Sequence, residues 1–389
     1  MARRRSARSN MGDKGMKREN RRFLVVGGGV GGMSAALSLR KQGTQVELID
    51  IDPEWRVLGA GITITGPTLR AFHRLGVLQD VANKGFLSEQ VKFYSCDGTF
   101  LHAMETRALE PGLPPAGGIM RPDLHNIFSS QVRAAGVAVR LGIAVQALEE
   151  NATGVNVTFS DGSQRRYDGV IGADGFQSAL RRLILPDAVE PHFTGQGCWR
   201  MIAPRPADLT GAEIYFGPGY KVGINPCSPD YSYLFVTMSM PGNPFIPREE
   251  LEDRLRDILA PIGGRIPEIR ARIGSESNVN YRPLEGLLLP PPWHVGRVGL
   301  IGDAIHATTP HLASGAGLAV EDGLLLGEYL AGAEDLNAAW TAFETRRWSR
   351  VQLVVENSFL ICRWEQEGGH EQDVARLMGE STAQLAQPM

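Results

Sequence analysis

Three glycines and one aspartate near the start of the chain have the spacing of a nucleotide-binding turn. Gly27, Gly29 and Gly32 directly follow the apolar run 23–26 and precede residues of helical character. Asp50 ends the next β-prone run. In such a turn the first glycine permits a tight bend, the second lets the backbone approach a pyrophosphate, the third lets helix and strand pack, and the acid accepts hydrogen bonds from a ribose. The spacing predicts a dinucleotide site and leaves FAD and NAD as alternatives.

A second aspartate, far along the chain, favours a flavin. Asp303 comes just after an apolar β-prone run, and the small residues Gly315, Ala316 and Gly317 follow at the start of a helical pattern. The carboxylate could bind a polyol chain, while backbone N–H groups at a helix start could face the ring edge that becomes anionic when a flavin is reduced. A helix cap followed by a tightly packed helix would give the same residues.

A third segment, residues 169–182, also ends a β-prone run. Asp174 and Gly175 stand at its tip, and Ser178 and Arg181 follow one turn into the next helical pattern. The segment is either a further part of the cofactor site or an ordinary strand-to-helix connection.

Together these segments resemble the single-component flavoprotein aromatic hydroxylases, the family of salicylate and 4-hydroxybenzoate hydroxylases. Two further motifs match: Arg56 with the GAGI run that ends in Gly61 and Ile62, and Arg121 in RPDLH. HATTPH at 306–311, followed by GAGLAVED, is most similar to the salicylate hydroxylase branch. Leu312, Ala313 and Leu318 depart from that branch, which often has polar residues or glycine there.

The resemblance implies FAD as the cofactor, NADH or NADPH as cosubstrate, and hydroxylation by O2 through a flavin C4a-hydroperoxide. It implies that the glycine turn binds the ADP part of FAD and that Arg121 contacts the phosphate and ribityl region. Asp174 and Gly175 would serve both FAD and the reducing nucleotide, and Asp303 would hold the ribityl chain. The substrate would be a small aromatic or N-heteroaromatic ring with a hydroxyl or amino substituent.

Four residues are candidates for substrate contact. By resemblance Pro310 borders the reacting edge of the flavin, and His311 beside it could relay a phenol proton near neutral pH. Arg200 and Tyr215 lie on β-prone runs whose facing the pattern leaves open, because a one-residue slip reverses it. A histidine in a proline-flanked loop, or a tyrosine in a sheet, is also compatible with a purely structural role.

The order of elements predicts an α/β fold with a discontinuous Rossmann-like FAD-binding domain, a mostly antiparallel β-sheet substrate domain and C-terminal helices, as in 4-hydroxybenzoate hydroxylase. Hairpins are expected around Asp97-Gly98 and Asp161-Gly162, and helices from Pro67 and Pro122. The predicted divisions are a disordered basic arm at 1–20, the FAD-binding domain at 21–85, 110–187 and 285–345, the substrate domain at 86–109 and 188–284, and a C-terminal helical segment at 346–389.

Composition excludes several classes of function. Residues 1–22 hold nine of the 40 bases and two of the 43 acids, so 31 bases face 41 acids in the rest of the chain, a poor balance for nucleic-acid binding. The four cysteines are far apart, which argues against a metal site and for a reducing, cytoplasmic location. No apolar run approaches the length of a membrane span. We expect a monomer or homodimer.

Three alternative functions remain open. A flavin-dependent halogenase is disfavoured because WRMIAP at 199–204 lacks the second tryptophan of the WxWxIP signature. A quinone-pathway hydroxylase could be held at a membrane by the apolar stripe of the C-terminal helix. A non-catalytic flavin redox sensor could use the basic arm to reach a partner.

Overall fold

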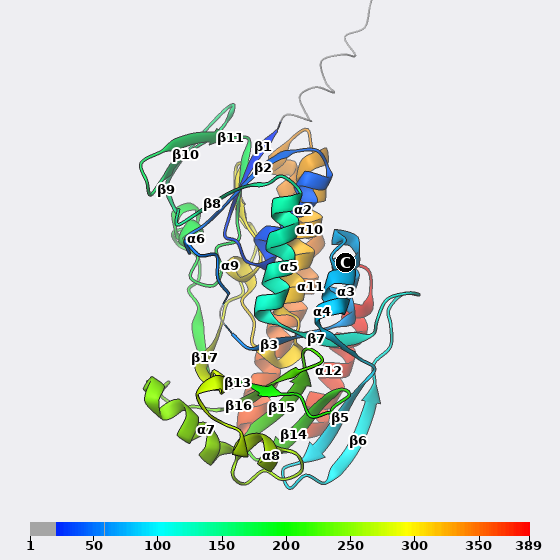
Figure 1. Ribbon diagram of the computed structural model, residues 1–389. Helices are drawn as coiled ribbons and strands as arrows, with labels where there is room; N and C mark the ends of the chain where they lie inside the picture. The colour runs from blue at the N-terminus through cyan, green and yellow to red at the C-terminus, as the bar shows by residue number, and fades with distance from the viewer. Residues whose placement is uncertain (1–20, 58) are drawn as a thin grey trace, which may run out of the picture.

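A six-stranded, mostly parallel sheet forms one end of the molecule (Figure 1). The computed structural model describes residues 21–57 and 59–389, and the predicted basic arm lies outside them. The strands run parallel except for the antiparallel edge strand β18. In order across the sheet they are β18 (His294–Val295), β19 (Val298–Leu300), β12 (Gly169–Gly172), β1 (Arg22–Val26), β2 (Gln45–Asp50) and β8 (Ala138–Leu141). The predicted α/β fold class is confirmed.

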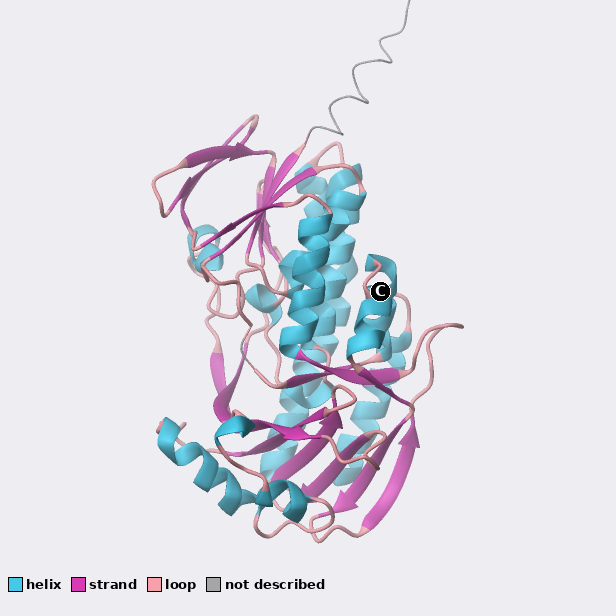
Figure 2. Ribbon diagram, in the orientation of Figure 1, coloured by secondary structure: helices cyan, strands magenta, loops and turns pink. Residues whose placement is uncertain are grey.

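Helices from distant parts of the chain pack beside this sheet (Figures 1 and 2). The helices of this layer are α2 (Val30–Lys41), α3 (Gly66–Leu75), α4 (Leu78–Lys84), α5 (Arg121–Ala134), α6 (Ala179–Ile184), α9 (Asp303–His306), α10 (Gly315–Gly332) and α11 (Leu336–Glu367). The 3-10 turn η3 (Pro310–Leu312) and α12 (Glu371–Ala386) pack against the C-terminal half of α11. Small residues let α2 and α10 approach closely: a Cβ on Gly323 would lie 2.4 Å from the Gly31 carbonyl oxygen.

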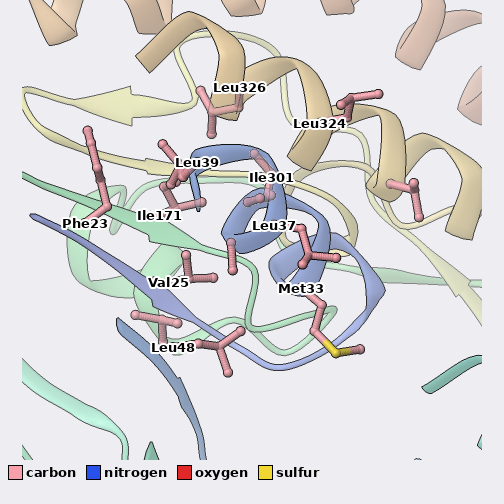
Figure 3. Close-up of a cluster of buried hydrophobic side chains, with 14 of the residues drawn as sticks. Phe23, Val25, Met33, Leu37, Leu39, Leu48, Ile171, Ile301, Leu324 and Leu326 are labelled. Carbon is pink, nitrogen blue, oxygen red and sulfur yellow. The ribbon is translucent and has the colours of Figure 1, made fainter. Parts of the chain in front are cut away.

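The core of this layer is formed by apolar side chains of β1, β2 and β12 against α2 and α10. Phe23 and Val25 of β1, Met33 of α2 and Leu326 of α10 are all fully buried, and Figure 3 draws them with their neighbours. A strand that is buried on both faces is expected to have a near-continuous apolar run, as residues 23–26 do.

A seven-stranded sheet forms the other layer of the molecule. All neighbouring strands are antiparallel except β14 and β5. In order across the sheet they are β17 (Asn280–Gly286), β13 (His192–Pro204), β16 (Tyr231–Ser239), β15 (Tyr220–Pro226), β14 (Ala212–Gly217), β5 (Gln90–Ser95) and β6 (Phe100–Glu105). Helices α7 (Leu251–Leu259) and α8 (Ile266–Ala271) cover one face, here called the outer face, and form a second apolar core with it.

Two small sheets complete the fold. The sheet of β3 (Gly61–Ile64), β7 (Ala116–Met120) and β4 (Phe86–Ser88) lies between the two layers in Figure 1. The other consists of β9 (Val145–Asn151), β10 (Gly154–Phe159) and β11 (Gln164–Tyr167), and short 3-10 turns occur at η1 (Arg248–Glu250) and η2 (Ser275–Ser277).

Both expected hairpins are present, as β5–β6 and β10–β11. Helix α11 continues through the predicted division at 345/346, so the FAD-binding domain and the C-terminal segment share one helix. None of the helices in the described residues is both long enough and apolar enough to cross a bilayer.

Candidate functional site

Three turns with chemistry-bearing residues follow three neighbouring parallel strands. The strands β19, β12 and β1 are adjacent in that order, and the turns after them carry Asp303, Asp174 and Gly27. Their carboxyl ends lie at one edge, the place where open α/β sheets bind ligands. A Cβ on Gly27 would lie 2.2 Å from the carbonyl oxygen that precedes Asp174, and Arg181 donates to the carbonyl oxygen of Ala304 at 2.9 Å. Segments about 270 positions apart in the sequence therefore converge.

The glycine turn has the shape that a pyrophosphate needs. Gly27 has a φ of +107°, and a Cβ on Gly32 would lie 2.0 Å from the Gly27 carbonyl oxygen, so both positions require glycine. A Cβ on Gly29 would meet nothing within 4 Å. Gly29 is the N-cap of α2, which has no side-chain cap and no acid in its first turn. The start of this 12-residue helix is thus open to an anion.

Asp50 lies beside the glycine turn and holds it in place. Its Oδ2 accepts a hydrogen bond from the Gly28 N–H at 2.6 Å, and its Oδ1 accepts one from Asp52 at 2.8 Å. Trp55 Nε1 donates to the Gly28 carbonyl oxygen at 3.0 Å, so both backbone groups of Gly28 are bound. Each carboxylate oxygen has a second lone pair for a ribose hydroxyl. Sequence reasoning missed Trp55, which belongs to the loop after Asp50.

Asp303 begins the short helix α9 directly after β19. Its side chain is exposed to solvent, yet desolvation by the surrounding protein raises its pKa. No hydrogen bond or ion pair between described residues involves this carboxylate, so its acceptor sites are available to a polyol chain.

A buried ionic network beneath the aspartate turn fixes its position. Asp322 of α10 accepts hydrogen bonds from the Gly302 N–H at 3.1 Å and from Arg347 Nε at 2.7 Å, and its Oδ2 lies 2.5 Å from His306 Nε2. The charges of His306 and Arg347 outweigh desolvation and lower the pKa of Asp322 to about 2. Sequence reasoning missed this support, although adjacent acids in an apolar helix were a signal that a cation had to pair with them.

The Asp174 carboxylate accepts hydrogen bonds at the start of helix α6. It accepts hydrogen bonds from Ser178 Oγ at 2.5 Å and from the Leu180 N–H at 3.0 Å. Gly175 adopts a φ of +79° at the tip of the turn. A role of this pair toward FAD or a reducing nucleotide stays a prediction.

Arg121 and Arg200 are two cations that have no counterion within the described part of the chain. No hydrogen bond or ion pair between described residues involves either guanidinium, and each side chain is half-buried. Desolvation and the nearby charge of Arg200 lower the pKa of Arg121, while Asp303 acts in the opposite direction. Arg121 therefore lies near both Arg200 and Asp303, and an anionic ligand placed between the two arginines would neutralise them.

The remaining residues of the predicted cofactor loops have other surroundings. The Arg56 side chain is 60% exposed and pairs with Glu54 of its own loop at 3.1 Å. A Cβ on Gly61 would lie 2.3 Å from Cys227 Sγ, so Gly61 is required for packing against the seven-stranded sheet.

The start of α10 lies close to a side chain of α3. A Cβ on Gly317 would lie 2.2 Å from Thr68 Oγ1, while Gly315 and Ala316 are half-buried at the first turn. That turn contains no acidic residue. The N-terminus of this 18-residue helix would favour an anionic group, and the predicted contact of residues 315–317 with the ring edge of a flavin stays a prediction.

The inner face of the seven-stranded sheet, opposite the outer face, carries Arg200 but not Tyr215. Alternation along β13 places Arg200 and Cys198 on the face opposite Trp199, which belongs to the outer core. Tyr215 is fully buried in the outer core, where it stacks on Tyr94 and donates to Glu213 at 2.9 Å. The expected substrate contact of Tyr215 is therefore corrected: its strand register turns it away from the cofactor layer.

His311 is buried behind the loop that presents Pro310. Its Nδ1 lies 2.9 Å from Thr309 Oγ1, and its Nε2 lies 3.1 Å from Gln196 Oε1 and 3.2 Å from Glu365 Oε2. Desolvation lowers its pKa. Both ring nitrogens are thus occupied, which corrects the expectation of a substrate-contacting relay. Pro310 itself is exposed.

Glu365 also bonds Lys221 Nζ at 2.5 Å and so connects α11, the inner face of the sheet and the loop that contains His311. This connection was absent from the sequence-based prediction. Among the described residues, no group of three or more histidine, cysteine or acidic side chains is arranged to hold a metal ion.

The fold, together with the site at the carboxyl ends of β1, β12 and β19 (the edge site), defines a flavoprotein of the FAD-dependent hydroxylase class. The chain belongs to the FAD binding domain family, whose model matches residues 21–358. It is 33% identical over 366 residues to a putative FAD-dependent monooxygenase, YetM, of Bacillus subtilis, covering 93% of this chain and 98% of that protein.

Two further comparisons agree with this assignment. The 2-heptyl-3-hydroxy-4(1H)-quinolone synthase of Pseudomonas aeruginosa is 30% identical, covering 88% of this chain and 90% of that protein. The crystal structure of Klebsiella pneumoniae HpxO complexed with FAD and uric acid has the same fold, with a TM-score of 0.82 at 23% identity over 95% of this chain and 97% of that one. The protein is an FAD-dependent monooxygenase.

Proposed function

We propose that the protein uses NAD(P)H and O2 to hydroxylate a small aromatic or N-heteroaromatic ring that carries a hydroxyl or amino group. The observation that carries this proposal is Arg200, which is half-buried on the inner face near Arg121 and has no ion pair or hydrogen bond to its side chain from another described residue. A guanidinium kept without a counterion in a partly desolvated place favours an anionic ligand.

The residues around the edge site fit FAD. The open helix start at Gly29 suits the pyrophosphate, and the available carboxylate of Asp303 suits the ribityl chain. We assign Arg121 to the phosphate and ribityl region. When bound and reduced, the flavin activates O2 and supplies an electrophilic oxygen.

The substrate ring must then be electron-rich and positioned. We assign Arg200 to the ring oxygen, where its positive charge stabilises the deprotonated, more nucleophilic form. Because His311 is fully engaged, the proton leaves by another acceptor. A relative whose name contains a hydroxyquinolone supports an N-heteroaromatic ring as one substrate type.

The inner face also excludes water. Tyr233 is buried, its hydroxyl lies 2.9 Å from Thr63 Oγ1, and it packs against Phe235. Apolar surroundings protect a reactive oxygen species from wasteful decay and strengthen the charge interactions of Arg200.

A substrate screen tests the proposal. Phenols, hydroxybenzoates, hydroxypyridines and purines are supplied to the FAD-loaded protein, and stimulated NADH or NADPH oxidation is measured together with product mass. We expect at least one ring to gain one oxygen atom. Nucleotide oxidation that no ring stimulates, or that yields only hydrogen peroxide for every ring, would contradict the proposal.

A matched pair of variants tests Arg200. Arg200→Met should raise the KM of an accepted hydroxylated ring about tenfold or more, because a hydrogen bond to a charged group is lost, while FAD absorbance is kept. Arg254→Met, on α7 at the outer face, should leave KM unchanged. An unchanged KM in Arg200→Met would remove Arg200 from the site.

A further inference from the structure

A row of residues crosses the inner face from Arg200 to the edge of the sheet. Residues paired across neighbouring strands point to the same face. The pairings give the row Arg200 (β13), Phe235 (β16), Gly223 (β15), Ile214 (β14), Phe93 (β5) and His102 (β6). From Arg200 to Phe93 it spans four strand intervals, about 19 Å.

The row is an almost continuous apolar surface. Gly223 has no side chain, and the space above it is filled from both sides: a Cβ there would lie 2.2 Å from the Phe235 ring and 2.9 Å from Ile214 Cδ1. Further along, Phe93 stacks on Phe216 of β14 with ring centroids 6.0 Å apart. No side chain interrupts the apolar path between Arg200 and Phe93.

The part of the row on β14, β5 and β6, farthest from Arg200, is open to solvent. Phe216 of β14 is 41% exposed, Met104 of β6 is 49% exposed, and Phe93 on the strand between them is half-buried. We call Ile214, Phe216, Phe93 and Met104 the apolar strip. Isolated exposed apolar residues are common, but a group of four on one inward face requires an explanation.

Charged groups are kept off this strip. Lys221 neighbours Phe216 across β15 and β14, but its ammonium group is paired with Glu365 of α11. Alternation sends Lys92 and Glu105 of the β5–β6 hairpin to the other face of the sheet. The strip is therefore suited to an uncharged aliphatic group.

We propose that the apolar strip binds an aliphatic arm of the substrate, attached to the ring that Arg200 positions. The inference rests on the proposed function, and it narrows the substrate class to rings that carry a hydrocarbon chain. We assign the strip to the substrate because the strip and Arg200 belong to one continuous row on the same face. A ring bound at Arg200 would direct its substituent along Phe235 toward Phe93.

Chain-length dependence of binding tests this inference. The probes are 2-alkyl-4-quinolones with methyl, butyl and heptyl chains, and their Kd values for the FAD-loaded protein are measured by titration calorimetry. We expect Kd to fall about twofold per methylene, less than the roughly fourfold of full burial because one side of the chain stays exposed.

Two matched variants locate the effect. Phe216→Asp should abolish the dependence on chain length while the methyl probe binds as before. Phe100→Asp is the control, because Phe100 of β6 lies in the same sheet and is 55% exposed but packs against Tyr94, which belongs to the other face. FAD absorbance and Tm confirm folding, and Phe216→Ala serves if Phe216→Asp proves unstable.

Several outcomes would overturn the inference. Equal Kd values for methyl and heptyl probes would do so, as would equal effects of Phe216→Asp and Phe100→Asp. If the wild-type protein sediments as a dimer and Phe216→Asp sediments as a monomer, the strip binds a second copy of the chain. If the wild-type protein binds lipid vesicles and Phe216→Asp does not, the strip binds a lipid surface. The substrate screen described under the proposed function uses rings without an alkyl chain and is independent of this test. If the protein hydroxylates such a ring but Kd does not depend on chain length, the proposed function stands and only this inference is wrong.

Discussion

At the scale of single residues, Asp303 is the most informative side chain of the site, because it combines exposure with desolvation and has no hydrogen-bonding or ionic partner among the described residues. A carboxylate held in this way is available for a ligand and contributes nothing to internal bonding. Its removal should therefore affect the cofactor much more than the fold.

We expect Asp303→Ala to weaken FAD binding by about 2 kcal/mol, or about thirtyfold in Kd, since hydrogen bonds to a charged group are lost. The protein should purify weakly yellow, and apoprotein titrations followed by flavin fluorescence measure the Kd. Asp187→Ala, at an exposed position without such surroundings, is the control. Full FAD occupancy in Asp303→Ala would exclude the assigned role.

Two glycines of one turn should respond differently to the same substitution. A Cβ on Gly29 meets no protein atom, so Gly29→Ala should keep the stability of the apoprotein and raise the FAD Kd at least tenfold by blocking the pyrophosphate. A Cβ on Gly32 lies 2.0 Å from a carbonyl oxygen, so Gly32→Ala should destabilise the apoprotein itself. Urea unfolding and FAD titration separate the two effects, and identical results for both variants would contradict this interpretation.

At the scale of elements, α11 meets the η3 loop through Glu365 and His311. Desolvation lowers the pKa of His311, against the opposing influence of Glu365, so the unfolded chain binds a proton more readily than the folded one. The stabilising contribution is complete above the unfolded pKa of about 6.5 and is lost as pH falls below it. The pKa of Glu365 is lowered as well, and its contribution declines only below the ordinary glutamate pKa of about 4.3.

We therefore expect Tm to decrease between pH 6.5 and 5 in the wild-type protein and to decrease less in His311→Gln. Thermal unfolding at half-unit pH steps measures both slopes. His73→Gln, at an exposed position of α3, should keep the wild-type slope. Parallel curves for His311→Gln and wild type would show that His311 does not couple this loop to pH.

The sequence was sufficient for elements with local signals and insufficient for contacts between distant segments. The glycine turn, the hairpins and the proline-initiated helices follow from short patterns. The Asp322–Arg347 and His311–Glu365 pairs join positions 25 and 54 residues apart, which no local pattern encodes. The facing of Tyr215 depended on strand register, and period-2 alternation alone cannot determine which face is covered by helices.

At the scale of the whole molecule, FAD would connect the parallel layer to the space beside the seven-stranded sheet. A ligand that binds only the folded state at a hundredfold excess over its Kd stabilises that state by about 2.7 kcal/mol. For a chain of this size we expect a Tm increase of about 3 °C on adding FAD to the apoprotein. Differential scanning calorimetry measures it, and an unchanged Tm at saturating FAD would contradict a site formed by the folded protein. AMP at the same concentration, which lacks the flavin and ribityl groups, should give a smaller increase.

Helix α11 has a consequence for how molecules enter and leave. It extends over 32 residues, about 48 Å. Near its start Trp340 packs against Gly299 of β19, and near its end Cys362 bonds Gln196 of β13. One continuous helix therefore contacts both layers, and a hinge motion that separates the layers would have to bend this helix. We therefore expect substrate to enter and product to leave through small rearrangements of loops. The turnover rate should then depend more on the flexibility of these loops than on a hinge motion between the layers.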